Sequence, residues 1–261
     1  MGRMQLFEIQ DQSWCPESAR DAITDHLRFG LNLWNQYAPI VPRLRDAMKR
    51  AGTRRVLDLC SGGGGPWLRL HRTFEQNGFP LEICLTDKYP NTAAFLRARS
   101  ESGNNIEFRE DPVDALRIPA GLDGFRTFFS SFHHFPPEEA RAILRDAVES
   151  RQGIAVFEAT RRDLRAMLIM IFLAPVMTLI FAPFIRPFRW SRLLWTYLIP
   201  IVPVAAVFDG LVSCARTYSP SDLRELTDGL DQSAYAWDIG EQGGAAVPVP
   251  ITYLIGSRKP V

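Results

Sequence analysis

The pattern of apolar and polar positions between residues 54 and 76 predicts a strand, a tight turn and a helix. The apolar run Val56–Leu59 has the length and the β-branched start of a buried strand, and glycines at 62–65 end it. After the turn, apolar residues recur at helical spacing, at Trp67, Leu70 and Phe74. We therefore expect the rest of the chain to be organised around this unit.

Strand and helix patterns alternate along most of the remaining sequence. The other predicted strands cover residues 81–86, 106–108, 125–132 and 154–159, and a closing antiparallel hairpin covers 234–239 and 250–257. The predicted helices cover residues 91–100, 137–149 and 221–230, and two more precede the first strand. This alternation is typical of an α/β domain with a mostly parallel sheet.

Residues 161–208 interrupt this alternation. Arginines precede an almost uncharged run at 167–185, and a second apolar run spans 193–208. The first run is about as long as the ~20 residues that a bilayer crossing needs, but Pro175 and Pro183 interrupt it. Three interpretations remain open: a hairpin dipping into one membrane leaflet with its arginines at the headgroups, an apolar lid over an active site, and a two-pass hairpin. The first two predict an apolar substrate.

Composition and charge narrow the class of protein. The chain has 261 residues, 46% of them hydrophobic, which is enough for one α/β domain with a large core. Its net charge of +1 gives no electrostatic reason to expect nucleic acid as a partner. The four cysteines lack metal-ligand spacing and the N-terminus lacks the apolar core of a signal peptide, so we expect a cytoplasmic protein without a metal. The apolar run adds peripheral attachment to the cytoplasmic membrane face as an expectation.

The glycine turn is typical of a loop that binds a nucleotide-like cofactor. Glycine lets the backbone approach a ligand closely, and the N–H groups that open the next helix can donate hydrogen bonds. No Lys-Ser or Lys-Thr follows the glycines, and Trp67 stands where a P-loop has its lysine, which argues against that loop. A dinucleotide-binding loop remains open, because it also has glycines after a strand and an acid about 20 residues further on.

The segment Val-Leu-Asp-Leu-Cys-Ser-Gly-Gly-Gly, with Asp87 ending the next strand, resembles the class I, Rossmann-like S-adenosylmethionine-dependent methyltransferases. The resemblance covers Arg54 to the C-terminus in order of elements. It implies a mostly parallel seven-stranded sheet with an antiparallel last strand. It also implies an N-terminal helical cap at 1–52 and a core at 53–160 and 209–261. The hydrophobic segment at 161–208 is an unusual insert that departs from the ordinary order of elements in the family. The chain departs from the family at Cys60, which replaces the first glycine of the motif.

The resemblance also implies which residues bind S-adenosyl-L-methionine. Asp87 would hold the ribose hydroxyls, because a carboxylate accepts from two hydroxyls at once. Asp114, which we prefer over Asp111, would accept from the adenine amino group. The remaining expected cofactor contacts are Asp58, Gly62, Gly64 and Ser131.

Two histidines follow the predicted fourth strand, where the family places residues next to the transferred methyl group. A neutral imidazole at His133 or His134 could remove a proton from an acceptor hydroxyl or amine. The pair could equally brace the next helix. Candidate substrate residues are Trp34, Tyr37, Asp209 and Tyr218, for which structural packing is the alternative.

The sequence thus predicts transfer of a methyl group from S-adenosylmethionine to an O or N atom of a hydrophobic small-molecule or lipid-like acceptor. One alternative is an RNA methyltransferase, which the near-neutral charge and the absence of an Asn/Asp-Pro-Pro-Tyr tetrad disfavour. A catalytically inactive, membrane-associated scaffold and an NAD-linked oxidoreductase are further alternatives. The oligomeric state is left open by the sequence.

Overall fold

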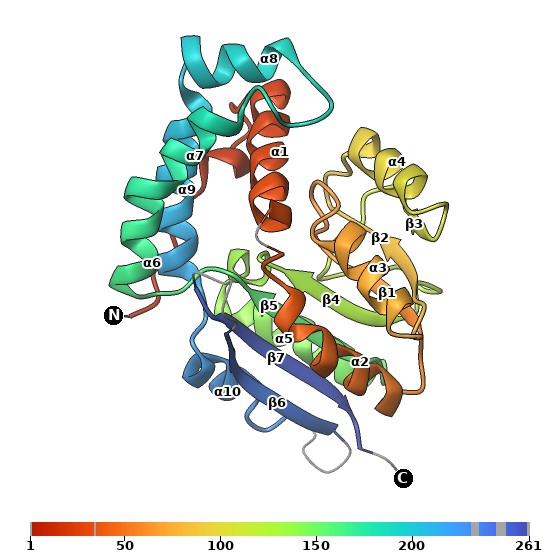
Figure 1. Cartoon of the computed structure of the whole chain (residues 1–261). Helices are drawn as coiled ribbons and strands as arrows, with labels where there is room; N and C mark the ends of the chain where they lie inside the picture. Colours follow the sequence, from red (N-terminus) through yellow and green to blue (C-terminus); the bar gives the residue numbers. More distant parts are fainter. Residues whose placement is uncertain (1, 34, 231–234, 244–248, 260–261) are drawn as a thin grey trace.

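A seven-stranded sheet forms the centre of the computed structural model, which describes residues 2–33, 35–230, 235–243 and 249–259 (Figure 1). The strand order is β3-β2-β1-β4-β5-β7-β6. β1 to β5 run parallel, whereas β7 runs antiparallel to both of its neighbours. The strands are Arg55–Asp58 (β1), Glu82–Leu85 (β2), Ile106–Phe108 (β3), Phe125–Phe129 (β4), Ile154–Glu158 (β5), Tyr235–Gln242 (β6) and Ile251–Arg258 (β7).

Helices cover both faces of the sheet. One face packs against α2 (Val41–Arg50), α3 (Trp67–Gln76) and α4 (Thr92–Glu101), and the other against α5 (Pro137–Glu149) and α10 (Pro220–Thr227). Successive strand side chains point to opposite faces. Phe125, Phe129 and Phe157 therefore join one core cluster, whereas Phe128 and Val156 join the other.

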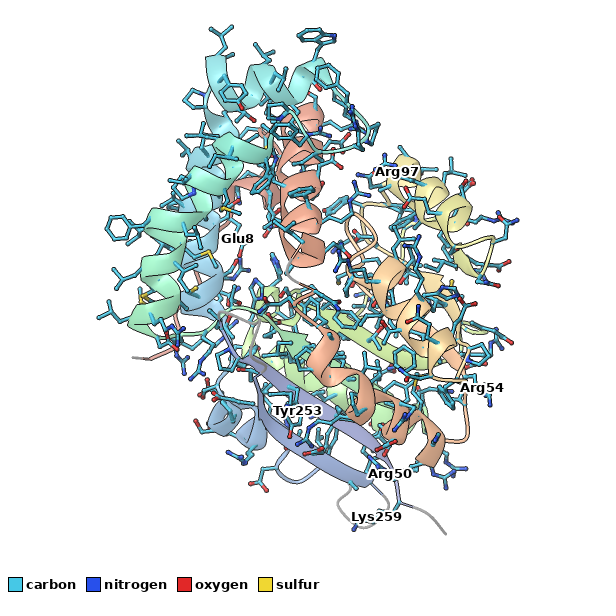
Figure 2. The ribbon with its side chains drawn as sticks, viewed as in Figure 1. Glu8, Arg50, Arg54, Arg97, Tyr253 and Lys259 are labelled. Carbon is cyan, nitrogen blue, oxygen red and sulfur yellow. The ribbon has the colours of Figure 1, made fainter. Side chains whose placement is uncertain are left out.

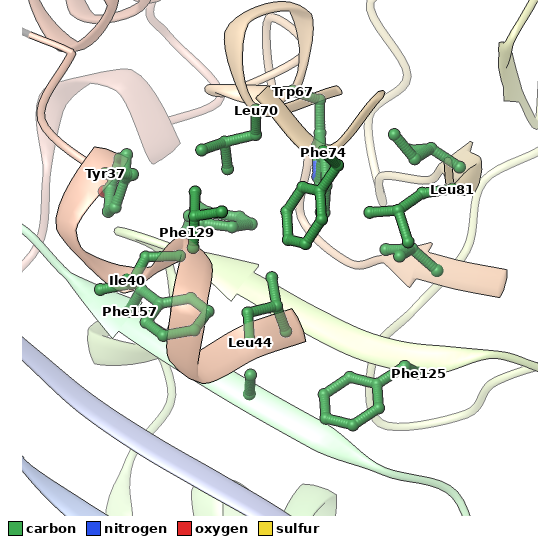
Figure 3. Close-up of a cluster of buried hydrophobic side chains, with 14 of the residues drawn as sticks. Tyr37, Ile40, Leu44, Trp67, Leu70, Phe74, Leu81, Phe125, Phe129 and Phe157 are labelled. Carbon is green, nitrogen blue, oxygen red and sulfur yellow. The ribbon is translucent and has the colours of Figure 1, made fainter. Parts of the chain in front are cut away.

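An aromatic group fixes α3 and the preceding segment on the sheet (Figure 3). The rings of Trp67 and Tyr37 pack edge-on against Phe129, with centroids 5.4 and 4.9 Å away. Trp67 and Tyr37 are almost fully buried. The tryptophan after the glycines therefore points into the core and away from the loop.

A second group of helices lies beside the sheet, next to the ends of β4 and β5 (Figure 1). Its first member is α1 (Glu17–Leu33), which packs against α8 (Trp190–Leu193) and α9 (Ile201–Arg216). The other members are α6 (Leu164–Leu168), the π-helical segments η4 (Ile169–Leu173) and η5 (Leu194–Leu198), and α7 (Ala174–Phe181). Arg192 of α8 is buried and bonds Asp25 of α1 at 2.5 Å, so the N-terminal helix and the insert form one helical layer.

The last helix of the insert and the N-terminal helix α2 both contact the core of the domain. α9 continues without a break through the expected boundary at residue 208, and α2 packs on β7 with the core. Among the described residues, Leu164–Phe181 is the one helical stretch long and apolar enough to cross a membrane, and 11% of it is buried. The two stretches Trp190–Leu198 and Ile201–Arg216, bent by 74° at their junction, satisfy the same length and composition criteria together.

The fourth strand is shorter than predicted. It ends at Phe129, because Ser130 takes a positive φ of 46° and the 3₁₀ turn η3 (Phe132–His134) follows. The expectation of a strand to residue 132 was wrong because the apolar run continues into this turn. Two further 3₁₀ turns, η1 (Ile9–Asp11) and η2 (Ala38–Ile40), lie in the N-terminal part.

Candidate active site

The glycine loop joins β1 to α3 at the carboxyl edge of the sheet. Gly62 and Gly64 have positive φ values of 51° and 93°, which L side chains rarely adopt. Cys60 also has a positive φ, 57°, so it takes the left-handed conformation that suits a glycine. The departure at Cys60 therefore leaves the backbone turn in place.

Asp87 follows β2 and faces this loop. Its Oδ2 accepts a hydrogen bond from the Gly62 N–H at 2.7 Å, and its Oδ1 accepts one from the Tyr89 N–H at 2.8 Å. Burial raises the pKa of Asp87, although both backbone bonds favour the charged form. Since each carboxylate oxygen has a second lone pair, Asp87 retains acceptors for a ligand hydroxyl.

Asp58, at the end of β1, is buried beneath the glycine loop. Its Oδ1 accepts from the Thr127 hydroxyl and its Oδ2 from the Ser61 hydroxyl, both at 2.6 Å. Burial raises its pKa to about 6 despite these bonds. Asp58 is 1% exposed, so this geometry supports bracing of the loop more directly than contact with a ligand.

The other expected cofactor residues lie at the same edge of the sheet. Asp114 is partly exposed, and its Oδ2 lies 3.0 Å from the Lys88 Nζ. The backbone N–H of Val113 donates to the carbonyl of Asp87 at 2.8 Å, which places Asp114 near Asp87. Ser131 is buried, and its hydroxyl has no hydrogen-bond partner among the described residues.

The loop fits a cofactor with a hydroxylated sugar. A Cβ built on Gly62 meets nothing within 4 Å, so the loop is open on that side, next to the Asp87 carboxylate. On the other side, a Cβ on Gly63 would lie 3.6 Å from the Arg28 Cδ of α1. The N-terminal helix therefore covers one flank of the loop, as a cap would.

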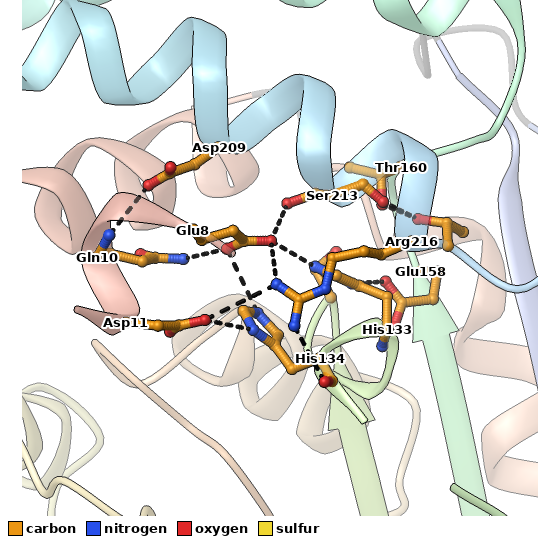
Figure 4. A network of polar contacts seen from close by, with 12 residues as sticks. Glu8, Gln10, Asp11, His133, His134, Glu158, Thr160, Asp209, Ser213 and Arg216 are labelled. Carbon is orange, nitrogen blue, oxygen red and sulfur yellow. Dashed lines mark hydrogen bonds and ion pairs between the residues drawn. The ribbon is translucent and has the colours of Figure 1, made fainter. Parts of the chain in front are cut away.

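His133 lies in the 3₁₀ turn η3 that follows β4 and is almost fully buried (Figure 4). Its backbone N–H donates to Glu158 Oε1 at 3.0 Å, and its Nδ1 lies 2.8 Å from Glu158 Oε2. Burial lowers the pKa of His133, but Glu158 and Glu8 outweigh burial and raise it to about 9. A buried imidazole that holds its proton near pH 7 is poorly suited to remove one from a substrate, so the geometry disfavours His133 as a general base.

His134 stacks on His133 with ring centroids 4.5 Å apart and is partly exposed. Its Nδ1 lies 3.1 Å from Asp11 Oδ2, and its Nε2 lies 3.7 Å from Glu8 Oε2. This is the arrangement of an imidazole oriented by a carboxylate, and it keeps His134 as the catalytic candidate of the pair.

Sequence reasoning missed the residues that surround the histidines. Glu8 is fully buried. Its Oε1 accepts a hydrogen bond from the Ser213 hydroxyl at 2.9 Å and lies 3.2 Å from Arg216 Nη1. Neither Glu8 nor Asp11 belongs to a local motif, because both reach the histidines from the N-terminal segment, more than 120 positions away in the sequence. The sequence offered one signal for this group of residues: Glu158 is an acidic residue at the end of the predicted fifth strand.

The expected substrate residues are held within the fold. The Tyr37 hydroxyl bonds Ser130 Oγ at 2.7 Å in the core. The Tyr218 hydroxyl donates to the Phe135 carbonyl at 2.7 Å, although its ring borders a hollow of about 280 Å³ beside Arg161 and Arg162. Asp209 accepts from the Ile9 N–H at 2.7 Å and so anchors the N-terminal segment. The alternative of structural packing therefore fits Tyr37, Tyr218 and Asp209. Trp34 lies outside the described residues.

The strand order and the glycine loop at the carboxyl edge are those of the class I, Rossmann-like methyltransferase fold, which confirms the predicted fold. PigF, solved with SAH, superposes with a TM-score of 0.51 at 16% identity, covering 95% of this chain and 63% of its own. The O-methyltransferase NcsB1 from neocarzinostatin biosynthesis, solved with S-adenosyl-L-homocysteine and 1,4-dihydroxy-2-naphthoic acid, superposes with a TM-score of 0.54 at 15% identity, covering 92% and 58%. The chain spans about three fifths of the length of these structures. No protein-family model and no curated protein sequence matches the chain.

Proposed function

We propose that the chain is an S-adenosylmethionine-dependent methyltransferase that methylates an O or N atom of a hydrophobic small-molecule or lipid-like acceptor. The observation that carries the proposal is the Asp87 carboxylate, which lies against the open side of a positive-φ glycine loop at the carboxyl edge of this fold. Asp87 would hold the ribose hydroxyls, Gly62 and Gly64 would let the cofactor approach the backbone, and Asp114 would contact the adenine.

The cofactor would supply an activated sulfonium methyl, so the protein's task is to bind, orient and exclude water. His134 is the chain's candidate for activating an acceptor O–H or N–H, with Asp11 orienting its ring. Acyl- or phosphoryl-type charge stabilisation is not needed for this displacement. A hydroxylated aromatic acceptor is supported by NcsB1, whose structures hold hydroxy-naphthoic acids.

Binding of S-adenosylhomocysteine, followed by calorimetry, tests the cofactor. Asp87→Asn should weaken binding about tenfold or more, because it removes charged acceptors worth about 1.5–3 kcal/mol. Asp111→Asn, an exposed acid three residues before Asp114, is the matched control and should bind normally. Absence of heat in the unmodified protein would favour the non-catalytic scaffold. A mass gain of one methylene, about 14 Da, in lipid extracts incubated with protein and S-adenosylmethionine would identify the acceptor.

The outward-facing apolar surface of the insert supports a membrane-derived acceptor. Side chains of α6 and α7 project away from the rest of the molecule (Figure 2). Large apolar side chains on the insert are among the most exposed in the chain; they include Leu164, Phe172, Phe184, Trp190 and Leu198, at 65–77% exposure. Soluble proteins rarely expose an apolar surface of this extent, so we propose that the insert contacts one membrane leaflet.

Two features of the insert refine that proposal. Its long helix faces outward, which disfavours the alternative of a lid packed over the active site. The expectation that all its arginines lie at headgroups does not hold for Arg192, which is buried against Asp25. Arg165 and Arg186 are exposed and form no ion pair among the described residues, so they are the candidates for headgroup contact.

Co-sedimentation with phosphatidylcholine–phosphatidylglycerol vesicles tests the membrane proposal. The double variant Leu168→Ser/Phe172→Ser should lose most of the vesicle-bound fraction, because two large apolar side chains, each worth about 1.5–3 kcal/mol when buried, no longer enter the leaflet. Leu96→Ser, on exposed α4, is the matched control. Equal sedimentation of both variants, or none by the unmodified protein, would refute leaflet contact.

A further inference from the structure

Three side chains from distant parts of the sequence meet beside η3 and form what we term the Glu8 cluster: Glu8, His133 and His134 (Figure 4). The His133 Nε2 lies 3.5 Å from Glu8 Oε1, and the His134 Nε2 lies 3.7 Å from Glu8 Oε2. One atom from each residue can be chosen so that all three lie within 4.8 Å of one another.

Each imidazole of the Glu8 cluster is oriented by a carboxylate on its other nitrogen. The His133 Nδ1 faces Glu158 at 2.8 Å, and the His134 Nδ1 faces Asp11 at 3.1 Å. Metal-binding histidines commonly donate their second ring N–H to a carboxylate, which fixes the ring and leaves the opposite nitrogen as the ligand. Both Nε2 atoms lie toward the Glu8 carboxylate, each near a different oxygen of it.

One of these ligand atoms lacks a hydrogen-bond partner among the described residues, although Glu8 Oε1 lies 3.5 Å from it. His133 is 2% exposed, and its Nε2 has no hydrogen-bond partner in the described part of the chain. A buried polar atom without a hydrogen-bond partner destabilises the fold, and a bound metal ion would give this nitrogen a partner.

We propose that Glu8, His133 and His134 bind one divalent first-row transition-metal ion, with zinc as the preferred occupant. Two imidazoles and one carboxylate form a typical three-residue zinc set with a fourth position open. Bonds of 2.0–2.1 Å in a tetrahedral site place neighbouring ligand atoms about 3.4 Å apart. The contacts of 3.5 and 3.7 Å involve different oxygens of Glu8, and one ligand atom from each residue lies within 4.8 Å of the other two, so the three ligands would move together by up to about 1.4 Å around the ion.

The charges around the Glu8 cluster accommodate a divalent ion. Three carboxylates, those of Glu8, Glu158 and Asp11, contact the cluster, and Arg216 Nη1, 3.2 Å from Glu8 Oε1, adds one positive charge. Both imidazoles must be neutral to bind the ion, so binding would release the proton that His133 otherwise holds; a doubly charged ion then brings this group to zero net charge. Ser213 and Gln10 donate to the Glu8 oxygens at 2.9 and 2.8 Å and hold the carboxylate in place.

A bound ion would have two consequences. It would fasten the N-terminal segment to the turn after β4, which Asp209 also holds through the Ile9 N–H. It would also take the Nε2 lone pair of His134, so this imidazole would hold the ion and could not act as a base; at its open position the ion would lower the pKa of an acceptor hydroxyl, whose proton would pass to solvent. The second consequence rests on the proposed function, whereas the metal site itself does not.

Metal content and X-ray absorption test the site in the full-length protein. After equilibration with zinc and removal of excess, we expect one zinc per chain by elemental analysis, with nitrogen and oxygen neighbours at 2.0–2.1 Å and no sulfur. Cobalt loading should give the visible spectrum of a tetrahedral ion. His134→Gln should weaken zinc binding at least about tenfold, while His71→Gln, a buried histidine outside the cluster, should bind zinc normally.

Sulfur neighbours in the absorption spectrum would place the ion on cysteines. Less than about 0.2 zinc per chain would show that the Glu8 cluster is an ion-pair network without a metal. Either result would overturn the proposal. Unchanged zinc affinity in His134→Gln would overturn it as well. The X-ray absorption spectrum of the unmodified protein tests the proposal even if the His134→Gln variant does not fold. Because S-adenosylhomocysteine binding is measured separately, loss of the metal site and failure of the proposed function are distinguishable.

Discussion

Replacement of Asp25 by Asn should reveal how strongly the N-terminal helix is tied to the insert. Arg192 is 1% exposed, and its guanidinium donates to Asp25 Oδ2 at 2.5 Å, to the Ile185 carbonyl at 2.8 Å and to the Pro187 carbonyl at 3.1 Å. Asp25→Asn keeps the volume but leaves the buried cation without its counter-charge. Breaking such a pair costs about 3–5 kcal/mol.

That loss is a large share of the roughly 5–15 kcal/mol that stabilises a typical domain. Arg192→Met should cost somewhat less, because Asp25 Oδ1 keeps its 3.4 Å contact with the Arg28 guanidinium. The double variant Asp25→Leu/Arg192→Met should cost far less than the sum of the single changes, because neither charge then remains buried alone.

Urea unfolding followed by tryptophan fluorescence measures these differences as shifts in midpoint at constant slope. Asp46→Asn is the matched control, since Asp46 pairs with Arg45 at 3.3 Å on the surface and should change stability by less than about 1 kcal/mol. A loss below about 1 kcal/mol for Asp25→Asn, or strict additivity in the double variant, would refute the reasoning.

Three further predictions concern single sites. In chelator-containing buffer, the free energy of unfolding should fall as pH rises from about 6.5 to about 9. The pKa of His133 is raised to about 9 in the folded state, so its charged form stabilises the fold fully below the pKa of an unfolded histidine, about 6.5, and this stabilisation is lost as pH rises through 9. A pH series of urea titrations should show this slope in the unmodified protein, and it should be absent in His133→Gln. Asn91→Ala should cost about 1 kcal/mol in thermal unfolding, since the Asn91 side chain caps α4 through the Ala94 N–H at 3.0 Å. Gly256→Ala should cost about 1–3 kcal/mol, because a Cβ would lie 2.3 Å from the Trp237 ring; calorimetry showing no change would contradict this packing.

Most of the fold could be predicted from local patterns in the sequence. Strand and helix positions followed from apolar periodicity. The closing antiparallel hairpin was predicted from its residue pattern, and the family resemblance agreed with it. The fourth strand was overextended because Phe132 is apolar and buried although it lies in a 3₁₀ turn. Periodicity reports burial and cannot distinguish a buried turn from the end of a buried strand.

The sequence by itself determined the glycine loop and the acid after the second strand, because both depend on short-range backbone geometry along adjacent elements. Only the tertiary structure decided what surrounds the histidines. Glu8 and Asp11 reach them from 125 and 123 positions away along the chain, and Arg216 from 82. Such a cluster has no local pattern, since its members are brought together by packing of α9 and the N-terminal segment against the carboxyl edge of the sheet, and that packing sets both the charge and the accessibility of each histidine.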